Sequence, residues 1–391
     1  MTIDVVIIEN FEPEAGLSDP ATCVYRLPEP LTGRLVQETA AQQLLDTDWS
    51  LPAWPVFGVQ SDVRQALAQA VAAGRPVVLA TLHTHDGAAP LGEGAQILFD
   101  GGAVAGFLSG GCVEGDVAIH AQTVLSDGAP RWLIYGRGGP PDIQLLCGSR
   151  IEVLLERIAP DDEAAGRLLA LTDARRPALW LSDGRAHACL AEGEDGAGLT
   201  PTLSAALQRA AEKPSVSGAT PEALFRRHTP RRRLVVVGGD PITLAVAKLA
   251  FEAGFETALV RPKGPSVPPP LPGVRYFRGK PGEAFAALGM DAFTAVAIAT
   301  HDIDIDHAAL CAVLPSEAGY VGALGSRRRL PERIARLQTS GLTETDIAKL
   351  HAPIGLSIGA RSPWEVAVSV VAEVIQAFKA QDAARTWPAA A

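Results

Sequence analysis

Leu234-Val-Val-Val-Gly-Gly-Asp-Pro241 is the stretch that decides the fold. Four apolar residues run into a double-glycine turn, and the next apolar residues recur at helical spacing through residues 244–251 until Gly254 ends the pattern. Residues 257–260 form an apolar returning strand. A strand, a glycine turn, a helix and a second strand in this order predict the opening of a Rossmann-like, doubly wound parallel sheet.

The same alternation continues toward the C-terminus. Further strands, separated by helices, are expected at residues 274–277, 295–299 and 319–323. The usual dinucleotide contacts are poorly matched, because Asp240 stands where a glycine lets the backbone approach a pyrophosphate, and Arg261 follows the second strand where an acidic residue binds a ribose. The pattern therefore disfavours NAD(P), although Arg261 and Lys263 could hold the extra phosphate of NADP.

Polar loops follow the later strands, at the carboxyl edge where open α/β sheets bind ligands. His301 and Asp302 lie in the segment that begins at Thr300, directly after residues 295–299. They either contact a polar ligand or its metal, or the segment is an acidic helix start capped by Asp302 or Asp304. The glycine turn after residues 319–323 carries three arginines, which suits a phosphate or a pterin phosphate but also a solvated helix face. Its candidate binding residues are Gly325, Ser326 and Arg327.

A glycine-rich loop, residues 353–363, precedes the last predicted helix. Ser362-Pro-Trp-Glu365 is a capping box with proline at the first helical position, so a long helix should follow to about Phe378. Gly355 and Arg361 in this loop either close over a ligand or only make the turn.

An N-terminal α/β domain is predicted to begin near Ser61, after an extension of residues 1–60 to which no chemistry is assigned. A helix capped by Ser61 or Asp62 should end at Gly74. Strands are expected at residues 77–82, 96–99 and 103–108. Residues 178–190 have the strand, Asp-Gly turn and strand of a hairpin, which we expect to form an edge of the first sheet.

His83 and His85 lie two residues apart, with Asp86 beside them. This spacing puts both imidazoles on one face of a strand and could suit a metal, but no third ligand is evident. The alternative, which we favour, is a loop that packs near Cys112.

Phe107-Leu-Ser-Gly-Gly-Cys-Val-Glu-Gly-Asp-Val117 presents one thiol at a strand-to-helix turn. After Cys112 the apolar residues recur at helical spacing until Gly128. Unpaired amides and the dipole at a helix start favour an anion, so Cys112 is a candidate thiolate that attacks sulfur or binds a soft metal, although Glu114 opposes this effect. The alternative is a small buried hydrophobic residue in a tight turn.

Cys147 has a similar setting, because residues 142–146 are predicted to be a strand that runs into Gly148. Two thiols could therefore approach one pocket. The other three cysteines lack this context and no CxxC pair occurs, which disfavours a structural zinc site; they are Cys23, Cys189 and Cys311.

The bulk composition fits two domains of ordinary size within 391 residues. The formal net charge of -10 argues against a nucleic-acid groove as the main function. Neither a signal peptide nor an apolar run of membrane-spanning length is evident, so we expect a cytoplasmic protein.

Several motifs in this order resemble the XdhC/CoxI family of xanthine dehydrogenase accessory proteins. They are Ser109-Gly-Gly-Cys-Val-Glu114, Cys147-Gly148, Thr300-His-Asp302, Gly322-Ala-Leu-Gly-Ser-Arg327, and residues 353–363 with Glu365 and Ala372-Glu373 beyond. The resemblance runs from about Val63 to Phe378. It implies an XdhC/CoxI-like domain at residues 61–230, a Rossmann-like domain at residues 231–380 and a tail at residues 381–391.

The resemblance also implies a function: a chaperone that binds molybdenum cofactor (molybdopterin) between its domains, protects it during sulfuration by a cysteine desulfurase, and inserts it into a molybdenum hydroxylase. It would be a carrier rather than a turnover enzyme, with no nucleic-acid partner and with a homodimer as a candidate assembly. By resemblance Cys112 contacts the metal. The implied cofactor-binding residues are Cys112, Gly110, Gly111, Glu114, Cys147, His301, Asp302, Gly325, Ser326, Arg327, Gly355 and Arg361. The alternatives are a NADP-dependent oxidoreductase and a persulfide relay through Cys112.

Overall fold

The computed structural model describes residues 51–87, 91–139, 143, 145, 148–212 and 217–385. The chain divides into two compact units, Met1–Asp46 and Thr47–Ala391, and the first lies outside the described residues. Of the extension predicted for residues 1–60, only the part from residue 51 is described, and it contains the 3-10 helix η1 (Val56–Gly58). Within the described residues, no helix has the length and apolar character needed to cross a membrane.

Five antiparallel strands form the first sheet, in the order β3-β2-β1-β5-β4. These strands are β1 (Val77–Asp86), β2 (Gln96–Phe99), β3 (Val104–Gly106), β4 (Arg131–Gly136) and β5 (Arg150–Ile158). Helices α2 (Arg64–Ala72) and α4 (Glu163–Asp173) share a core with β1 and β5 through Leu67, Leu168 and Leu154. Helix α3 (Glu114–Asp127) contacts β1 and β5. The sheet thus carries α3, and with it the loop that holds Cys112.

A second antiparallel sheet has the order β7-β6-β9-β8. Its strands are β6 (Ala178–Ser182), β7 (His187–Ala191), β8 (Ser217–Ala219) and β9 (Leu224–His228). The predicted hairpin is confirmed as β6 and β7. The prediction that it forms an edge of the first sheet was wrong, because β9, which the sequence analysis missed, pairs with β6 along its whole length.

The alternation of β6 explains this separate sheet. Trp180 packs into the core that contains α4, whereas Leu179 and Leu181 point the other way and pack against α5 (Pro201–Glu212). Strand β6 is therefore buried on both faces and needs a helix on each side.

Six parallel strands form the third sheet, in the order β12-β11-β10-β13-β14-β15. They are β10 (Arg233–Val237), β11 (Glu256–Val260), β12 (Arg275–Phe277), β13 (Thr294–Ile298), β14 (Tyr320–Ala323) and β15 (Leu350–His351). Counted from β10, the order is 3-2-1-4-5-6, which is that of a Rossmann sheet. The predicted fold class is confirmed, and β15 is an addition that the sequence analysis did not predict.

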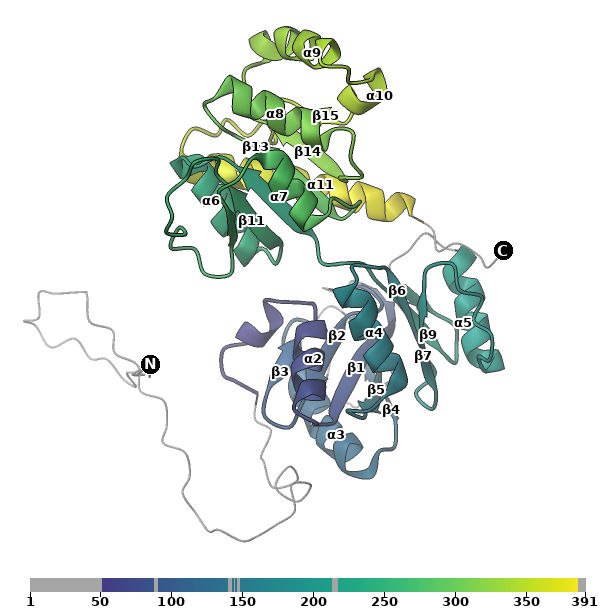
Figure 1. The fold of residues 1–391 in the computed structure, drawn as a ribbon. Coiled ribbons are helices and arrows are strands. Elements are labelled where there is room, and N and C mark those ends of the chain that lie inside the picture. Colours follow the sequence, from purple (N-terminus) through teal and green to yellow (C-terminus); the bar gives the residue numbers. More distant parts are fainter. Residues whose placement is uncertain are drawn as a thin grey trace, which may run out of the picture. The chain divides into compact units, whose positions relative to one another are not determined.

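Helices cover both faces of this sheet (Figure 1). Leu234 and Val236 share a core with α6 (Pro241–Glu252) and α11 (Pro363–Ala384), and Val235 and Val237 share the opposite core with α7 (Pro281–Leu288) and α8 (Ile303–Val313). The chain then continues through η2 (Arg327–Arg329), α9 (Leu330–Thr339) and α10 (Glu344–Ile347).

Side-chain caps fix the starts of the helices at the carboxyl edge. Asp302 caps α8, and Ser362 and Glu365 form the predicted capping box of α11.

The cap predicted for the first helix was wrong: Val63 precedes α2 without a side-chain cap, while Asp62 accepts hydrogen bonds from the amide and guanidinium of Arg64.

Candidate functional site

The thiol loop, residues 107–113, leaves β3 and enters α3. Gly110 and Gly111 have φ angles of +124° and +95°, a backbone region that other residues adopt only with strain. Val113, the last residue before the helix, is fully buried. The two glycines therefore turn the chain so that Val113 enters the core while Cys112 remains exposed.

Glu114 holds this loop from the inside and is only 1% exposed. Its Oε1 accepts hydrogen bonds from the amides of Leu108 (3.1 Å) and Ser109 (2.7 Å). Its Oε2 accepts from the Ser109 hydroxyl (2.8 Å) and from the amides of Gly111 (3.1 Å) and Val113 (3.3 Å). Burial alone would raise the pKa of Glu114, but these hydrogen bonds outweigh it and hold the pKa below its ordinary value. The carboxylate faces the loop, so Glu114 is a positioning residue, and its contact with a cofactor stays a prediction.

The amides of the thiol loop are thus used internally. The Cys112 amide donates to the Ser109 hydroxyl (3.2 Å), and the neighbouring amides donate to Glu114. The sequence analysis assumed free amides at this helix start, and that assumption was wrong because Glu114 and Ser109 already accept from them. The thiolate at Cys112 stays a prediction. The exposure of the thiol remains: a Cβ added at Gly111 would meet no atom within 4 Å, so the space beside Cys112 is open.

The first turn of α3 has a second anchor. The Tyr135 hydroxyl donates a hydrogen bond of 2.7 Å to Asp116, and burial raises the pKa of Tyr135 far above its ordinary value. Asp116 also lies 3.6 Å from the imidazole of His120. The helix that follows the thiol is therefore tied to β4.

The two histidines of β1 have different surroundings. His83 is buried, its Nε2 lies 2.9 Å from the Thr220 carbonyl and its Nδ1 lies 3.6 Å from Glu152, whereas His85 is exposed. Both histidines lie on β1, so the loop predicted from His83 onward is wrong for residues 83–86. A register shift between Leu82 and Thr84 falls at His83. Among the described residues no group of three or more His, Cys, Asp or Glu side chains could hold a metal ion.

The second predicted thiol, Cys147, lies outside the described residues, as do most residues of the strand predicted at 142–146. Of the other thiols in the described part, Cys189 is buried, where desolvation raises its pKa to about 12, and Cys311 is partly buried. Cys112 is the exposed cysteine of the described residues.

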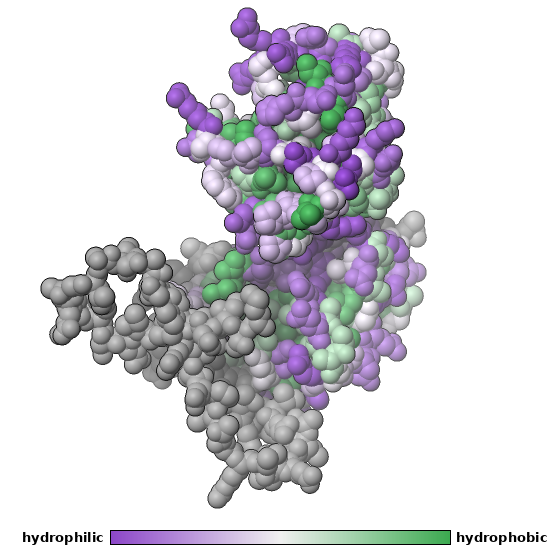
Figure 2. All heavy atoms as spheres, turned by 60° about the vertical axis from the view of Figure 1, so that its left-hand side comes forward, coloured by the Kyte–Doolittle hydropathy of each residue, from purple (hydrophilic) through white to green (hydrophobic). Residues whose placement is uncertain are grey.

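A cavity of about 600 Å³ lies at the carboxyl ends of β13 and β14. It brings together three of the predicted residues, His301, Gly325 and Ser326, although they come from two different loops. Its further lining residues are Thr300, Ile303, Asp306, His307, Leu324, Arg329, Leu330, Glu332, Arg333, Arg336, Ala352 and Pro353. Mostly hydrophilic side chains gather at the top of Figure 2, at the height where Figure 1 places α9.

Asp306 and Arg333 fix the floor of this cavity. Asp306 is 5% exposed and accepts hydrogen bonds from the Thr300 hydroxyl (2.7 Å) and from Arg333 (3.3 Å). Burial raises the pKa of the Asp306 carboxyl. Arg333 also donates to the Leu324 carbonyl (3.2 Å), which fixes its guanidinium against the glycine turn.

Other predicted residues lie outside the cavity lining. Asp302 caps α8 by accepting from the amides of residues 304 and 305, and Arg327 is exposed at the start of η2. The Gly355 amide donates to Glu373, which also accepts from the Tyr320 hydroxyl (2.7 Å). The Arg361 amide donates to Glu365 (2.8 Å). These contacts give Asp302, Gly355 and Arg361 structural roles, and their contact with a ligand stays a prediction.

The first turn of the Rossmann sheet is occupied by its own side chains. Asp240 caps α6 by accepting from the Thr243 amide (2.8 Å), and it lies 3.1 Å from His301. Arg261 packs over Gly239, where an added Cβ would lie 2.3 Å from the guanidinium. Both side chains lie at the first turn of the parallel sheet, and the expectation that NAD(P) binding is disfavoured stays a prediction.

Three arginines line the cavity, Arg329, Arg333 and Arg336. The sequence analysis included Arg329 among the three arginines of the glycine turn and missed the other two. Their spacing of four and three residues places them on one face of α9 and the turn before it. That spacing was the signal that could have found them.

Two protein families match this chain. Residues 234–374 match the family described as the XdhC Rossmann domain, and residues 70–136 match the XdhC and CoxI family. The second match includes the thiol loop and Glu114.

Relatives match this chain over most of its length. The "Molybdenum cofactor insertion chaperone PaoD" of Escherichia coli (strain K12) is 30% identical over 78% of this chain and 85% of its own length. A probable xanthine dehydrogenase subunit from Bacillus subtilis (strain 168) is 27% identical over 77% of this chain and 93% of its own. A crystal structure of a xanthine dehydrogenase from Bacillus halodurans has a TM-score of 0.66 and 25% identity, and the match covers 81% of this chain and 96% of that one.

Proposed function

This chain belongs to the XdhC and CoxI family, and we propose that it binds molybdenum cofactor and inserts it into a molybdenum enzyme of the xanthine dehydrogenase type. The observation that carries the proposal is the exposed Cys112 thiol on a loop ordered by Glu114, within the residues that match the family. The similarity to an insertion chaperone over most of both chains supports the same function.

The residues at the thiol loop fit a molybdenum cofactor as cargo. A cysteine thiolate is a soft ligand, and molybdenum in such a cofactor would accept it as a ligand that can be exchanged. Cys112 would bind the metal, Glu114 and Ser109 would keep the loop in place, and the open side of Gly111 would admit the bulk of the cofactor. The bound cofactor would supply the redox chemistry of the client, while this chain would hold, orient and release it.

We further propose that a cysteine desulfurase supplies the terminal sulfur while the cofactor is bound, and that both steps take place in the cytoplasm. An exposed thiol is accessible to a partner protein as well as to the cofactor. The protein would act as a carrier and would not turn over a substrate.

The test is to produce the protein in cells that synthesise molybdenum cofactor and to compare it with Cys112→Ala and Cys311→Ala. Oxidised pterin fluorescence and molybdenum content are measured on each purified protein. We expect pterin and molybdenum together on the wild type and on Cys311→Ala, and much less of both on Cys112→Ala. Absence of pterin from all three proteins would contradict the proposal.

A persulfide relay through Cys112 is distinguished by mass spectrometry after incubation with a desulfurase and cysteine. An added sulfur atom on Cys112 in a protein that never retains pterin would favour the relay over the chaperone. Retained pterin that depends on Cys112 would favour the chaperone.

A further inference from the structure

We infer that the cavity at the carboxyl ends of β13 and β14 binds the phosphate group of a phosphate monoester, with Arg329, Arg333 and Arg336 as its cationic contacts. The inference depends on the proposed function only for the source of that phosphate, which is either the pterin cofactor or a free nucleotide. The site itself is argued from the residues of the cavity.

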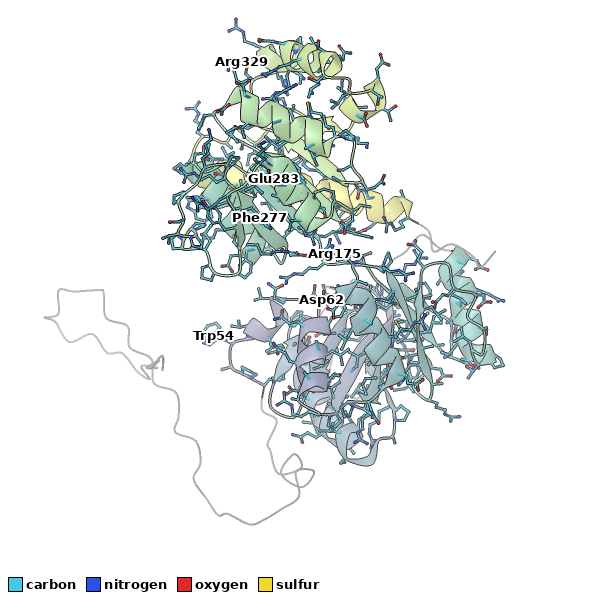
Figure 3. All side chains as sticks on the ribbon, viewed as in Figure 1. Trp54, Asp62, Arg175, Phe277, Glu283 and Arg329 are labelled. Carbon is cyan, nitrogen blue, oxygen red and sulfur yellow. The ribbon has the colours of Figure 1, made fainter. Side chains whose placement is uncertain are left out.

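The three arginines reach the cavity from one helix face, and they differ in how far their guanidinium groups are already paired. Arg333 is fixed by Asp306 at 3.3 Å and by a backbone carbonyl. Arg336 pairs with Asp304 at 2.7 Å, but the Asp304 side chain is 84% exposed, so water screens this pair and an incoming anion can replace it. The guanidinium of Arg329 makes no hydrogen bond or ion pair with any of the residues that the structure describes. Figure 3 labels Arg329 where the chain enters α9.

The charged side chains of the cavity lining have a net positive charge, which favours one bound anion. Two carboxylates line the cavity with the three arginines, and Asp306 is already satisfied by Thr300 and Arg333. Glu332 is the other carboxylate. It lowers the net positive charge of the cavity lining, and among the described residues it does not pair with Arg329. A phosphate monoester carries up to two negative charges and several acceptor oxygens, so it can accept hydrogen bonds from more than one arginine at once.

The size and the position of the cavity indicate an ester rather than free phosphate. A volume of about 600 Å³ is typical of a pocket for a small organic ligand. The cavity lies where parallel sheets bind their ligands, and Ser326 on the glycine turn offers a hydroxyl beside the arginines. The organic part of the ligand would lie against Ile303, Leu324 and Leu330.

The test uses the full chain, purified without cofactor, and titrates it calorimetrically with inorganic phosphate and with adenosine monophosphate. The variants are Arg329→Gln, Arg329→Lys and the matched control Arg328→Gln, because Arg328 is the exposed neighbour that does not line the cavity. Loss of one charge-assisted contact should weaken binding about tenfold in Arg329→Gln. Arg329→Lys should lie between this variant and the wild type, and Arg328→Gln should bind as the wild type does.

A second measurement separates the two sources of the phosphate. Pterin content is measured on wild type, Arg329→Gln and Arg328→Gln produced in cofactor-synthesising cells. Pterin lost only from Arg329→Gln would assign the site to the phosphate of the cofactor. Unchanged pterin together with tight binding of the nucleotide would assign it to a nucleotide.

The inference is overturned if the wild type binds neither phosphate nor nucleotide, or if Arg328→Gln weakens binding as much as Arg329→Gln does. The proposed function fails in a different way, through absence of pterin from wild type. Circular dichroism and thermal unfolding of each variant establish that a loss of binding is not a loss of fold.

Discussion

Glu114 is a buried charge whose hydrogen bonds all return to the loop that precedes it. One carboxylate accepts four amide hydrogen bonds and one from the Ser109 hydroxyl. Hydrogen bonds to a charged acceptor are stronger than neutral ones, and they are lost together if the acceptor is removed. The exposure of Cys112 therefore depends on a residue that a ligand need not touch.

We expect Glu114→Gln to lower the free energy of unfolding by about 1–3 kcal/mol, because an amide cannot accept all of these hydrogen bonds. Urea denaturation measures the change. The control is Glu163→Gln, an exposed glutamate in the first turn of α4, which should change stability little. The rate at which the Cys112 thiol reacts with a disulfide reagent should also change in this variant, because the loop loses the hydrogen bonds of Glu114.

The pH dependence of this contribution has a definite sign. The folded protein holds the pKa of Glu114 below its ordinary value of 4.5, so the stabilisation is present above that value and is lost as the pH falls through the folded pKa. The difference in stability between wild type and Glu114→Gln should therefore shrink in acid. An unchanged difference would contradict the role assigned to the charge.

His187 is a second charged residue with a measurable pH effect. Its Nε2 lies 2.5 Å from Asp162 and its Nδ1 lies 3.5 Å from Glu156, and the ring stacks on Trp180. Burial alone would lower the pKa of His187, but the two carboxylates raise it to about 10. The imidazolium thereby joins β7 to the start of α4, where Asp162 is the cap.

We expect His187→Gln to destabilise the protein at pH 7 and to differ much less from wild type above pH 10. A raised pKa means that the stabilisation is complete below about pH 6.5 and is lost as the pH rises through about 10. Unfolding free energies at the two pH values check this, with Asp162→Asn as the variant of the partner. A difference that grows with pH would contradict the assignment.

At the scale of elements, the start of α11 shows how a short polar motif positions a long helix. Ser362 accepts from the Glu365 amide, and Glu365 accepts from the amides of Ser362 and Arg361. Glu373, two turns further on, accepts from the Gly355 amide. Helix α11 thus binds the glycine-rich loop near the start of the loop, at Gly355, and near its end, at Arg361 and Ser362.

We expect Ser362→Ala to cost about 1 kcal/mol of stability, as loss of a helix cap usually does. The unfolding free energies of wild type, Ser362→Ala, Glu365→Ala and the double variant, measured with heat and with urea, make up a double-mutant cycle. The two changes should be non-additive because they remove one reciprocal motif. Full additivity would show that the capping box does not act as a unit.

These elements also show what a sequence can predict. Five strands of the parallel sheet and the cap of α11 were predictable, since their patterns are local: a run of apolar residues, or Ser-Pro-Trp-Glu. β8 and β15 were missed because their residues, Ser-Gly-Ala and Leu-His, form no run of apolar or β-branched side chains. The Gly-Gly-Cys turn was also local, whereas the cavity joins loops some twenty residues apart, and only the parallel order of β13 and β14 brings them together.

At the scale of the whole molecule, α11 carries an apolar stripe of three large side chains that are exposed in the part of the chain that the structure describes. Trp364, Val368 and Ile375 are 52%, 49% and 40% exposed. In an antiparallel pair of α11 helices related by a two-fold axis near residues 371 and 372, Val368 of one copy would face Ile375 of the other, and Trp364 would face the exposed Lys379. This arrangement would cover the stripe of each copy with the same stripe of the other copy.

We expect the protein to be a homodimer through this stripe. Light scattering after size exclusion should give the mass of two chains for wild type and of one chain for Val368→Glu. The matched control is Val267→Glu, which adds the same charge at an exposed valine in the segment between β11 and β12 and should remain dimeric. A monomeric wild type, or a dimer that survives Val368→Glu, would contradict this interface.

The internal anchoring of the thiol loop has a consequence for how readily cargo is exchanged. Because Glu114 orders the loop when the chain folds, the backbone entropy of residues 107–113 is already lost before a ligand arrives. A ligand at Cys112 therefore meets a rigid platform, and the loop need not close on arrival or reopen on departure. A handover of the proposed cargo between proteins would then need no rearrangement of this loop.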